Sequence, residues 1–160
     1  MKTLIIIRHA KAEQTLGQDS KRKLTEKGLR DANLMAKQLL SKGYKIDKIF
    51  TSPSVRTIET ASVFAEVHGV SNENIKNFEG LYLGDTLQIT EAINWLQEDI
   101  ATLAVVGHNP GVSNFINDIT KSLEEDLPTC GTAVVKVDCT DWQQFNDAKK
   151  TLIEIDTPKA

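Results

Sequence analysis

Two histidines and two arginines in this sequence stand where an α/β protein would gather its chemistry. Arg8 and His9 follow directly on a short apolar run, and His108 follows another such run at residues 103–106. Arg56 falls in the first turn of a helix that is expected to follow a third run. The carboxyl ends of the strands in an open α/β sheet are where functional groups collect. The four side chains are therefore expected to share one pocket.

This combination of side chains suits the transfer of a phosphoryl group. A phosphoryl group spreads negative charge over its oxygens, and its transfer is catalysed mainly by positioning and electrostatic stabilisation. The planar guanidinium of arginine stays charged and binds phosphate oxygens in pairs. An imidazole that is neutral at physiological pH can act as the nucleophile and divide one difficult step into two.

Each of these residues also has a structural explanation when it is taken alone. An Arg-His pair after a strand could lie in a surface loop, His108 could cap the next helix, and Arg56 could be a solvated helix residue. The remaining histidine, His68, precedes Gly69 at an expected helix end and is interpreted as a C-terminal cap. The shared position at strand ends favours the catalytic interpretation for the other two histidines.

The elements that must position these residues alternate between short β-type runs and longer helical stretches. Strands are expected at 4–7, 48–51, 103–106, 133–137 and 151–155, and helices at about 26–42, 53–68, 86–98 and 110–119. Residues 14–23 are expected to form a polar loop, and residues 70–85 an irregular segment. This order predicts an α/β fold, a three-layer α/β/α sandwich with a mostly parallel central sheet and antiparallel edge strands from the C-terminal pair.

Local signals indicate where three of these helices begin. Thr25 is expected to cap the first helix, with Leu24 and Leu29 placed for a hydrophobic staple. Ser52-Pro53 and Asn109-Pro110 each combine a capping side chain with a proline suited to the first helical position. The two helices that begin there would direct N–H donors and positive dipole ends toward the pocket.

The bulk properties are those of a small globular protein. The 160 residues are expected to form a single domain, 1–160, of ordinary composition, 40% hydrophobic and 26% charged. The 19 Lys and Arg residues against 22 Asp and Glu argue against nucleic acid or a membrane surface as a partner, because both require a basic patch. The apolar start is too short for a signal peptide or a membrane span, so a cytoplasmic location is expected, with Cys130 and Cys139 as free thiols.

The motifs around the pocket residues resemble those of the histidine phosphatase superfamily. Residues 8–13, Arg-His-Ala-Lys-Ala-Glu, resemble its signature, whose usual form is Arg-His-Gly. Residues 52–60, Ser-Pro-x-x-Arg-x-x-x-Thr, and 106–110, Val-Gly-His-Asn-Pro, are similar to its second and third blocks. The resemblance covers nearly the whole chain, and three blocks in order are specific.

Further matches are to the short SixA-like branch of that superfamily. The segment 19–28 is similar to its "D..R.LT..G" pattern through Asp19, Arg22, Leu24, Thr25 and Gly28. The chain length and the Thr157-Pro158-Lys159 ending also resemble this branch. The usual glycine after the Arg-His pair is replaced here by Ala10, so the backbone at that position is not expected to need a positive φ.

The resemblance implies a phosphoglycerate mutase-like fold and a phosphatase that forms a phosphohistidine intermediate. Carried onto this chain, it makes His9 the nucleophile and assigns Arg8, Arg56 and His108 to the phosphoryl oxygens. The backbone N–H of Asn109 is expected to join them. No cofactor and no metal are implied, and the sequence has no HxH, HExxH or paired-cysteine motif. Zinc held by the two histidines would lack a third ligand at a suitable spacing.

The general acid is the weakest part of this assignment. Larger members supply a carboxylate from the region between the second and third blocks, where this chain offers Glu79 and Asp85. Neither lies in a clear motif, and each is more simply explained as a loop carboxylate. Arg22 is a candidate substrate contact or, equally, a solvated loop arginine. A leaving imidazole, as in phosphohistidine, would depend less on an acid than an alkoxide would.

These observations lead to the hypothesis of a SixA-like phosphatase that removes phosphate from phosphohistidine in a protein. The short chain has no long insertion that could cover a small substrate. The alternatives are a small-molecule phosphomonoesterase or mutase of the same superfamily, and a phosphate-binding module that has lost catalysis. The binding module is disfavoured because all four pocket residues are present. A nucleotide-binding protein is disfavoured because the glycine-rich motifs GxGxxG and GxxxxGK[ST] are absent.

Overall fold

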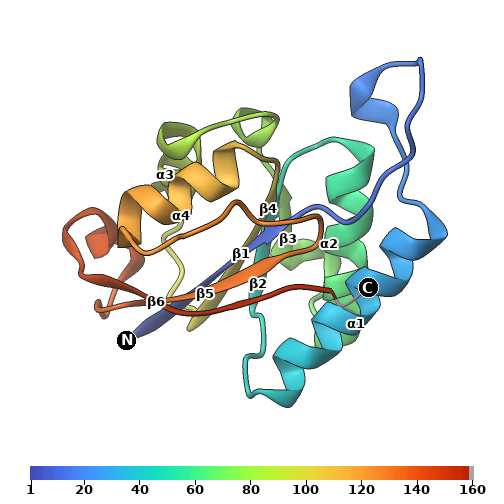
Figure 1. Cartoon of the computed structure of the whole chain (residues 1–160). Helices are drawn as coiled ribbons and strands as arrows, with labels where there is room; N and C mark the ends of the chain where they lie inside the picture. The colour runs from blue at the N-terminus through green and yellow to red at the C-terminus, as the bar shows by residue number, and fades with distance from the viewer. Residues whose placement is uncertain (159–160) are drawn as a thin grey trace.

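The computed structural model describes residues 1–158, so Lys159 of the C-terminal motif lies outside the described part of the chain. Helices cover both faces of a six-stranded sheet with the order β3-β2-β4-β1-β5-β6 (Figure 1). The strands are β1 (Lys2–Arg8), β2 (Lys48–Thr51), β3 (Ile75–Asn77), β4 (Thr102–Gly107), β5 (Thr132–Val137) and β6 (Lys150–Asp156). The predicted three-layer α/β/α sandwich is confirmed.

The strand directions divide the sheet into two parts. β3, β2, β4 and β1 are parallel neighbours, whereas β5 is antiparallel to β1 and β6 is antiparallel to β5. The C-terminal strands are therefore antiparallel as expected, but only β6 is an edge, because β5 lies between β1 and β6. The other edge, β3, belongs to a segment that was expected to be irregular. Its three residues are too few for a β pattern to be recognised.

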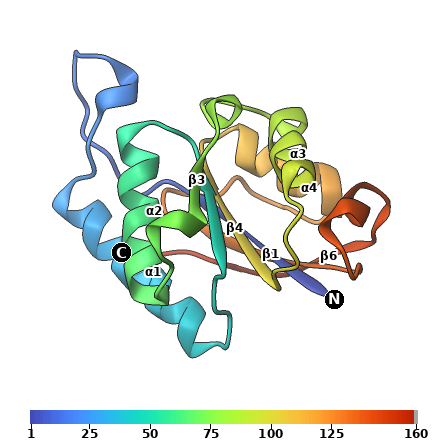
Figure 2. The same cartoon turned by 180° about the vertical axis from the view of Figure 1, so that it is seen from behind.

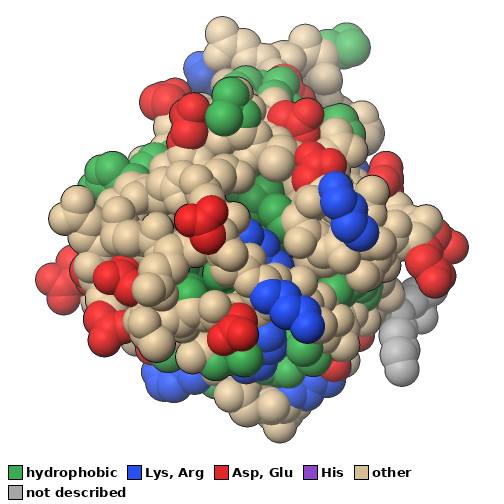
Figure 3. Space-filling model, turned by 90° about the vertical axis from the view of Figure 1, so that its left-hand side faces the viewer, with side chains coloured by type: hydrophobic (Ala, Val, Ile, Leu, Met, Phe, Trp, Pro, Cys, Tyr) green, Lys and Arg blue, Asp and Glu red, His purple; other side chains and the backbone are tan. Residues whose placement is uncertain are grey.

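The helices pack in pairs on the two faces of the sheet. They are α1 (Glu26–Ser41), α2 (Val55–His68), α3 (Thr86–Trp95) and α4 (Gly111–Thr120). Figure 2 shows α1 and α2 on one side of the strands and α3 and α4 on the other. None of the described helices is long and apolar enough to cross a membrane. On the face seen in Figure 3, acidic and basic side chains are interspersed with hydrophobic ones.

The hydrophobic core has one cluster on each side of the sheet. Successive residues of β1 alternate between them: Leu4 and Ile6 pack into the cluster with α3 and α4, and Ile5 and Ile7 pack into the cluster with α1 and α2. All four side chains are fully buried. A strand covered on both faces needs apolar residues at every position, which explains the unbroken run in the sequence.

The N-terminus of α1 follows the sequence prediction. Thr25 caps it, accepting a hydrogen bond from the Gly28 N–H at 3.0 Å. A side chain at Gly28 would place its Cβ 2.2 Å from the carbonyl oxygen of Lys11, so only glycine allows this approach. The expected staple is not supported, because Leu29 is 44% exposed and lies outside the core cluster that contains Leu24.

Two predicted helix starts are wrong. The cap of α2 is Ser54, whose hydroxyl accepts from the Thr57 N–H, whereas Ser52 bonds to a histidine ring described below. The cap position of α4 is Pro110, and the side chain of Asn109 bonds elsewhere. In both cases the predicted cap precedes the observed one by one or two residues. The predicted residue is of a type that caps helices, but its side chain bonds to another partner.

Two smaller differences concern helix ends. α3 stops at Trp95 rather than at residue 98. His68 is not a cap: its ring is buried, with Nδ1 accepting from the Ile46 N–H and Nε2 donating to the Ala36 carbonyl. It joins α2 to α1 and to the segment before β2. Gly69 does end α2 in the left-handed conformation, as expected.

Candidate active site

The candidate site lies at the carboxyl ends of the parallel strands. Parallel pairing of β1 with β4 places Arg8 beside Gly107, and the His9 N–H donates to the Gly107 carbonyl at 3.1 Å. His108 follows β4 directly, so the two strand exits bring the two histidine rings to a centroid distance of 5.5 Å. The backbone after His9 is held by α2, because Thr60 Oγ1 accepts from the Ala10 N–H at 3.0 Å. Ala10 has no positive φ, as predicted.

The ring of His9 is neutral and has one nitrogen free of a proton. Its Nδ1 lies 2.7 Å from the Ala10 carbonyl, which can only accept, so Nδ1 carries the proton and donates it. Nε2 is then unprotonated. The ring is 7% exposed, and burial, together with the charges of Arg56 and Arg8, lowers the pKa of His9 to about 4. At neutral pH, Nε2 therefore keeps its lone pair.

The ring of His108 is fixed in the opposite tautomer. Arg56 Nη2 donates to His108 Nδ1 at 3.1 Å, and because a guanidinium cannot accept, Nδ1 must be unprotonated. His108 Nε2 then carries the proton and donates to Ser52 Oγ at 2.8 Å. Burial and the nearby Arg56 charge lower the pKa of His108 to about 3, so this ring is neutral as well.

Arg8 is held by the segment that precedes β5. Its Nη1 donates to the Leu127 carbonyl at 2.9 Å, and Asn109 Nδ2 donates to the same oxygen at 2.8 Å. Asn109 Oδ1 in turn accepts from Ser113 Oγ, and Ser113 Oγ accepts from the Leu127 N–H. The Asn109 side chain thus supports Arg8 through a shared acceptor. The predicted contact of the Asn109 backbone N–H with phosphate stays a prediction.

Arg56 is 3% exposed and is held through the outer edge of its guanidinium. Its Nη1 donates to the Asp19 carbonyl at 2.8 Å, and its Nη2 donates to Asp19 Oδ2 at 2.9 Å. The hydroxyl of Tyr82 donates to the same Oδ2 at 2.6 Å. This bond, with those from Arg56 and Arg22, holds the pKa of the Asp19 carboxyl well below its usual range, so Asp19 is ionised.

Two buried N–H groups of the site have no acceptor in the described part of the protein. They are Nε of Arg8 and Nε of Arg56. Buried donors without a partner are rare in folded proteins, because leaving one unpaired is costly. Here the two unpaired N–H groups belong to arginines on either side of a neutral histidine. Together they form an anion-binding site that a phosphoryl group could occupy.

Of the remaining predicted residues, Arg22 and Asp85 have structural partners of their own, and Glu79 is exposed. Arg22 Nε donates to the Glu13 carbonyl at 2.7 Å, and its Nη1 forms an ion pair with Asp19, so it stabilises the 14–23 loop beside the site. Asp85 takes part in the capping box of α3 and accepts from Asn114 Nδ2. Glu79 begins the short 3-10 helix η3 (Glu79–Leu81) and is exposed. Their roles in substrate binding or acid catalysis stay predictions.

Sequence reasoning missed two residues that contact the pocket. Asp19 was noted only as part of the "D..R.LT..G" motif. That motif was the available signal for a role of Asp19 near the site. Tyr82 was not singled out, and its neighbours in the sequence give no signal, since its ring meets the edge of the His108 ring only in the folded chain, at 5.5 Å. The residue Ser52 was identified correctly as part of a motif but was given the role of a cap.

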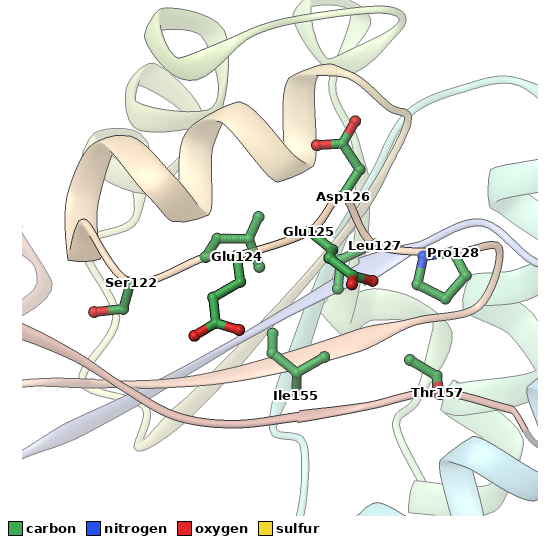
Figure 4. A pocket seen from close by; sticks show the side chains of 9 residues that line it. Ser122, Glu124, Glu125, Asp126, Leu127, Pro128, Ile155 and Thr157 are labelled. Atoms are coloured by element: carbon green, nitrogen blue, oxygen red, sulfur yellow. The ribbon is translucent and has the colours of Figure 1, made fainter.

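A groove of about 280 Å³ lies beside the site, between the segment 122–128 and β6 (Figure 4). Glu124 and Glu125 line it together with Ile155 of β6. Leu127 lines the groove and also supplies the carbonyl that holds Arg8. Within residues 1–158, no three His, Cys, Asp or Glu side chains are grouped so that they could hold a metal ion.

Both the fold and the strand-end arrangement of Arg8, His9, Arg56 and His108 define an α/β protein built around an anion-binding site with a neutral histidine. The model of the histidine phosphatase superfamily, branch 1, matches residues 4–109. The chain therefore belongs to the histidine phosphatase superfamily, as the sequence predicted.

This chain is similar to a relative and to solved structures over nearly its full length. An uncharacterised protein of Mycobacterium leprae is 25% identical over 96% of this chain and 100% of its own. Protein histidine phosphatase SixA in complex with tungstate has a TM-score of 0.84 and 22% identity, covering 98% of this chain and 97% of its own. A mycobacterial glucosyl-3-phosphoglycerate phosphatase has a TM-score of 0.73 and 13% identity, covering 100% of both chains. The SixA-like fold is confirmed.

Proposed function

We propose that this protein is a phosphohistidine phosphatase in which His9 is the nucleophile. The observation that carries the proposal is the unprotonated Nε2 of His9 beside the unpartnered Nε–H groups of Arg8 and Arg56. A phosphoryl group bound there would meet a lone pair on one side and two cationic donors on the other.

In the first step, His9 Nε2 forms a bond to phosphorus while the bond from phosphorus to the leaving group breaks. The electron pair of that bond goes to the leaving nitrogen, and an imidazole that carries a proton on its other nitrogen departs neutral. Arg8 and Arg56 stabilise the charge on the phosphoryl oxygens. The Ala10 carbonyl holds the proton on Nδ1, so phosphorylated His9 is a cation.

In the second step, water attacks phosphorus and the bond to Nε2 breaks. The electron pair returns to the cationic ring of His9, which restores the neutral imidazole. The two protons of the attacking water stay on the product phosphate or pass to solvent, and inorganic phosphate leaves. His108, neutral and fixed by Arg56 and Ser52, keeps the guanidinium of Arg56 in place throughout.

The choice of phosphohistidine as substrate is supported by the state of the carboxylate that holds Arg56. Asp19 touches Arg56, but it is ionised and accepts hydrogen bonds from Arg56 and Tyr82, so it has no proton to give. A departing alkoxide is strongly basic and would need a proton donor, whereas a departing imidazole depends much less on such a donor. The second candidate is a small-molecule phosphomonoesterase, since the fold is shared with the glucosyl-3-phosphoglycerate phosphatase.

The test is to trap the phosphorylated enzyme. The protein is mixed with a radiolabelled phosphohistidine protein, and the label on the enzyme is examined for acid lability and mapped to a peptide. The expected result is acid-labile phosphate on His9, absent from His9→Ala and present in the matched control Lys11→Ala, whose side chain is exposed. Label without His9, or hydrolysis that survives His9→Ala, would contradict the proposal.

Substrate class is decided by the same preparation. Rates are compared for the phosphohistidine protein, free phosphohistidine, phosphoserine and a sugar phosphate. The expected order places both phosphohistidine substrates above the two esters. Brisk hydrolysis of the sugar phosphate with none of either phosphohistidine would select the small-molecule phosphomonoesterase instead. Phosphate binding without any turnover would select the binding module.

A further inference from the structure

We propose that Asp19, locked by Tyr82, is a positioning residue that holds Arg56 with its Nε–H directed to the phosphoryl group. This inference rests on the proposed function and extends it. It assigns a role to the loop 14–23, which Figure 1 shows projecting beyond the carboxyl ends of the strands. The loop carries Asp19 at the start of the short 3-10 helix η1 (Asp19–Lys21).

The geometry shows how Asp19 decides which edge of the Arg56 guanidinium stays free. The backbone oxygen of Asp19 takes Nη1, and its carboxylate takes Nη2. The only other protein acceptor of Nη2 is His108 Nδ1 among the described residues. Nε is the buried nitrogen of Arg56 that has no acceptor within residues 1–158. A guanidinium fixed along one edge presents the other in a constant direction, which is what binding to a planar set of phosphoryl oxygens requires.

Asp19 needs this support from outside its own loop because its side chain is 45% exposed. Tyr82 provides it: the phenol donates to Asp19 Oδ2, and the ring stands at 88° to the ring of His108. One tyrosine thus contacts both the residue that holds Arg56 and the histidine that Arg56 bonds. Arg22 adds an ion pair at 3.2 Å to the other carboxylate oxygen.

Asp19 could act in two other ways, and both make different predictions. As a proton donor it would have to be protonated, which the low pKa of its carboxyl opposes. As a negative charge alone it would weaken the attraction of Arg56 for phosphate, so removing it would tighten phosphate binding. A positioning residue should behave in neither way, because its removal frees the guanidinium to turn.

The experiment compares Asp19→Ala with Asp19→Asn, and uses Asp138→Asn as the control. Asp138 is exposed and adjoins the end of β5 that pairs with the start of β1, at the opposite end of the sheet. Asp19→Ala is expected to lower kcat about 30- to 100-fold with a smaller change in KM, because an oriented donor acts most on the transition state. Asp19→Asn keeps an acceptor oxygen. Its decrease in log kcat should therefore be smaller than that of Asp19→Ala by about a third or more. Asp138→Asn should match the original protein.

Tyr82→Phe tests the same contact without touching the charge. The Asp19 carboxylate should lose its lock, and kcat should fall about three- to tenfold. Tyr44→Phe is the matched control, because Tyr44 lies against Lys136, which pairs with Thr3 at the start of β1, away from the strand ends of the site. Thermal unfolding of each variant shows whether the fold is intact, and Tyr82→Phe decides the question if Asp19→Ala fails to fold.

Several outcomes would overturn the inference. Equal kcat losses in Asp19→Ala and Asp19→Asn, with the alkaline side of the pH profile removed in both, would make Asp19 a proton donor. Tighter binding of inorganic phosphate in both, with kcat unchanged, would make it only a charge. Calorimetric titration with inorganic phosphate does not depend on turnover: binding weakened by Asp19→Ala supports positioning even if trapping on His9 fails, so the two proposals can be judged separately.

Discussion

Arg56 Nη2 donates a hydrogen bond to His108 Nδ1 at 3.1 Å, and this single contact settles the tautomer of the histidine. Because the guanidinium cannot accept, His108 must carry its proton on Nε2, where Ser52 Oγ receives it. His9 has the reverse arrangement, with its proton on Nδ1 and its lone pair on Nε2. The two histidines of the site thus have different chemistry although both are neutral.

Removing the Ser52 hydroxyl should release the His108 ring. Ser52 is fully buried, so Ser52→Ala leaves the Nε2–H without an acceptor, which costs about 1–3 kcal/mol of folding free energy. We expect kcat/KM to fall about tenfold, because a loosened ring no longer holds Arg56. Steady-state kinetics and urea denaturation measure the two effects. Ser122→Ala, at an exposed position, is the control, and unchanged kinetics in Ser52→Ala would contradict the assigned tautomer.

Both histidine rings should remain neutral well below the pH at which free histidine titrates. The pKa of His9 is lowered to about 4 and that of His108 to about 3, chiefly by burial. Their ring C–H resonances, followed by NMR from pH 8 down to pH 4, should not shift near pH 6.5. Assignment uses His9→Asn. A resonance of either ring that titrates near pH 6.5 would show that the ring becomes charged at a higher pH than this site allows.

The same depressed pKa values predict that the fold weakens in mild acid. The unfolded chain binds protons on its histidines below about pH 6.5, whereas folded His9, His68 and His108 resist protonation. Their contribution to stability is therefore present above pH 6.5 and is lost as the pH falls toward 4. Urea denaturation at pH 7.5, 6 and 5 should show a steadily smaller free energy of unfolding. A constant value over this range would contradict the prediction.

Gly28 should not tolerate a side chain. In Gly28→Ala the new Cβ would lie 2.2 Å from the Lys11 carbonyl oxygen, so α1 or the segment after β1 has to move. We expect a loss of about 2 kcal/mol or more in the free energy of unfolding, and reduced activity because residue 11 follows the Arg-His pair closely. Gly17→Ala is the control, since its nearest neighbour would be 3.8 Å away. Equal stability of the two variants would refute the close approach.

Thr60 should be needed for its hydroxyl rather than its shape. Its Oγ1 accepts from the Ala10 N–H and donates to the Arg56 carbonyl at 2.8 Å. Thr60→Val keeps the volume but leaves the buried N–H unpaired, which costs about 1–3 kcal/mol. We also expect lower kcat, because the backbone that directs His9 is loosened. Thr151→Val, at an exposed position of β6, is the control for a change of residue type.

Among the described residues, the sequence by itself determined five of the six strands, the four α-helices and most of the pocket. Apolar runs at 4–7 and 103–106 predicted buried parallel strands, and residues placed just after them could be expected to meet because parallel strands end at one edge. The superfamily motifs pointed to the same four residues. These signals are local, since burial on both faces fixes the residue type at each position of a strand.

Other features depended on contacts that no local signal records. Ser52 and Asn109 have the residue types of helix caps, but the folded chain offers them stronger partners in His108 and the Leu127 carbonyl, and the helices begin later. Asp19 and Tyr82 are 63 positions apart and meet only when the loop 14–23 and the segment after β3 converge over Arg56. The tautomers of both histidines, and the edge of Arg56 that stays free, were decided by tertiary structure, because each depends on which acceptor lies within reach.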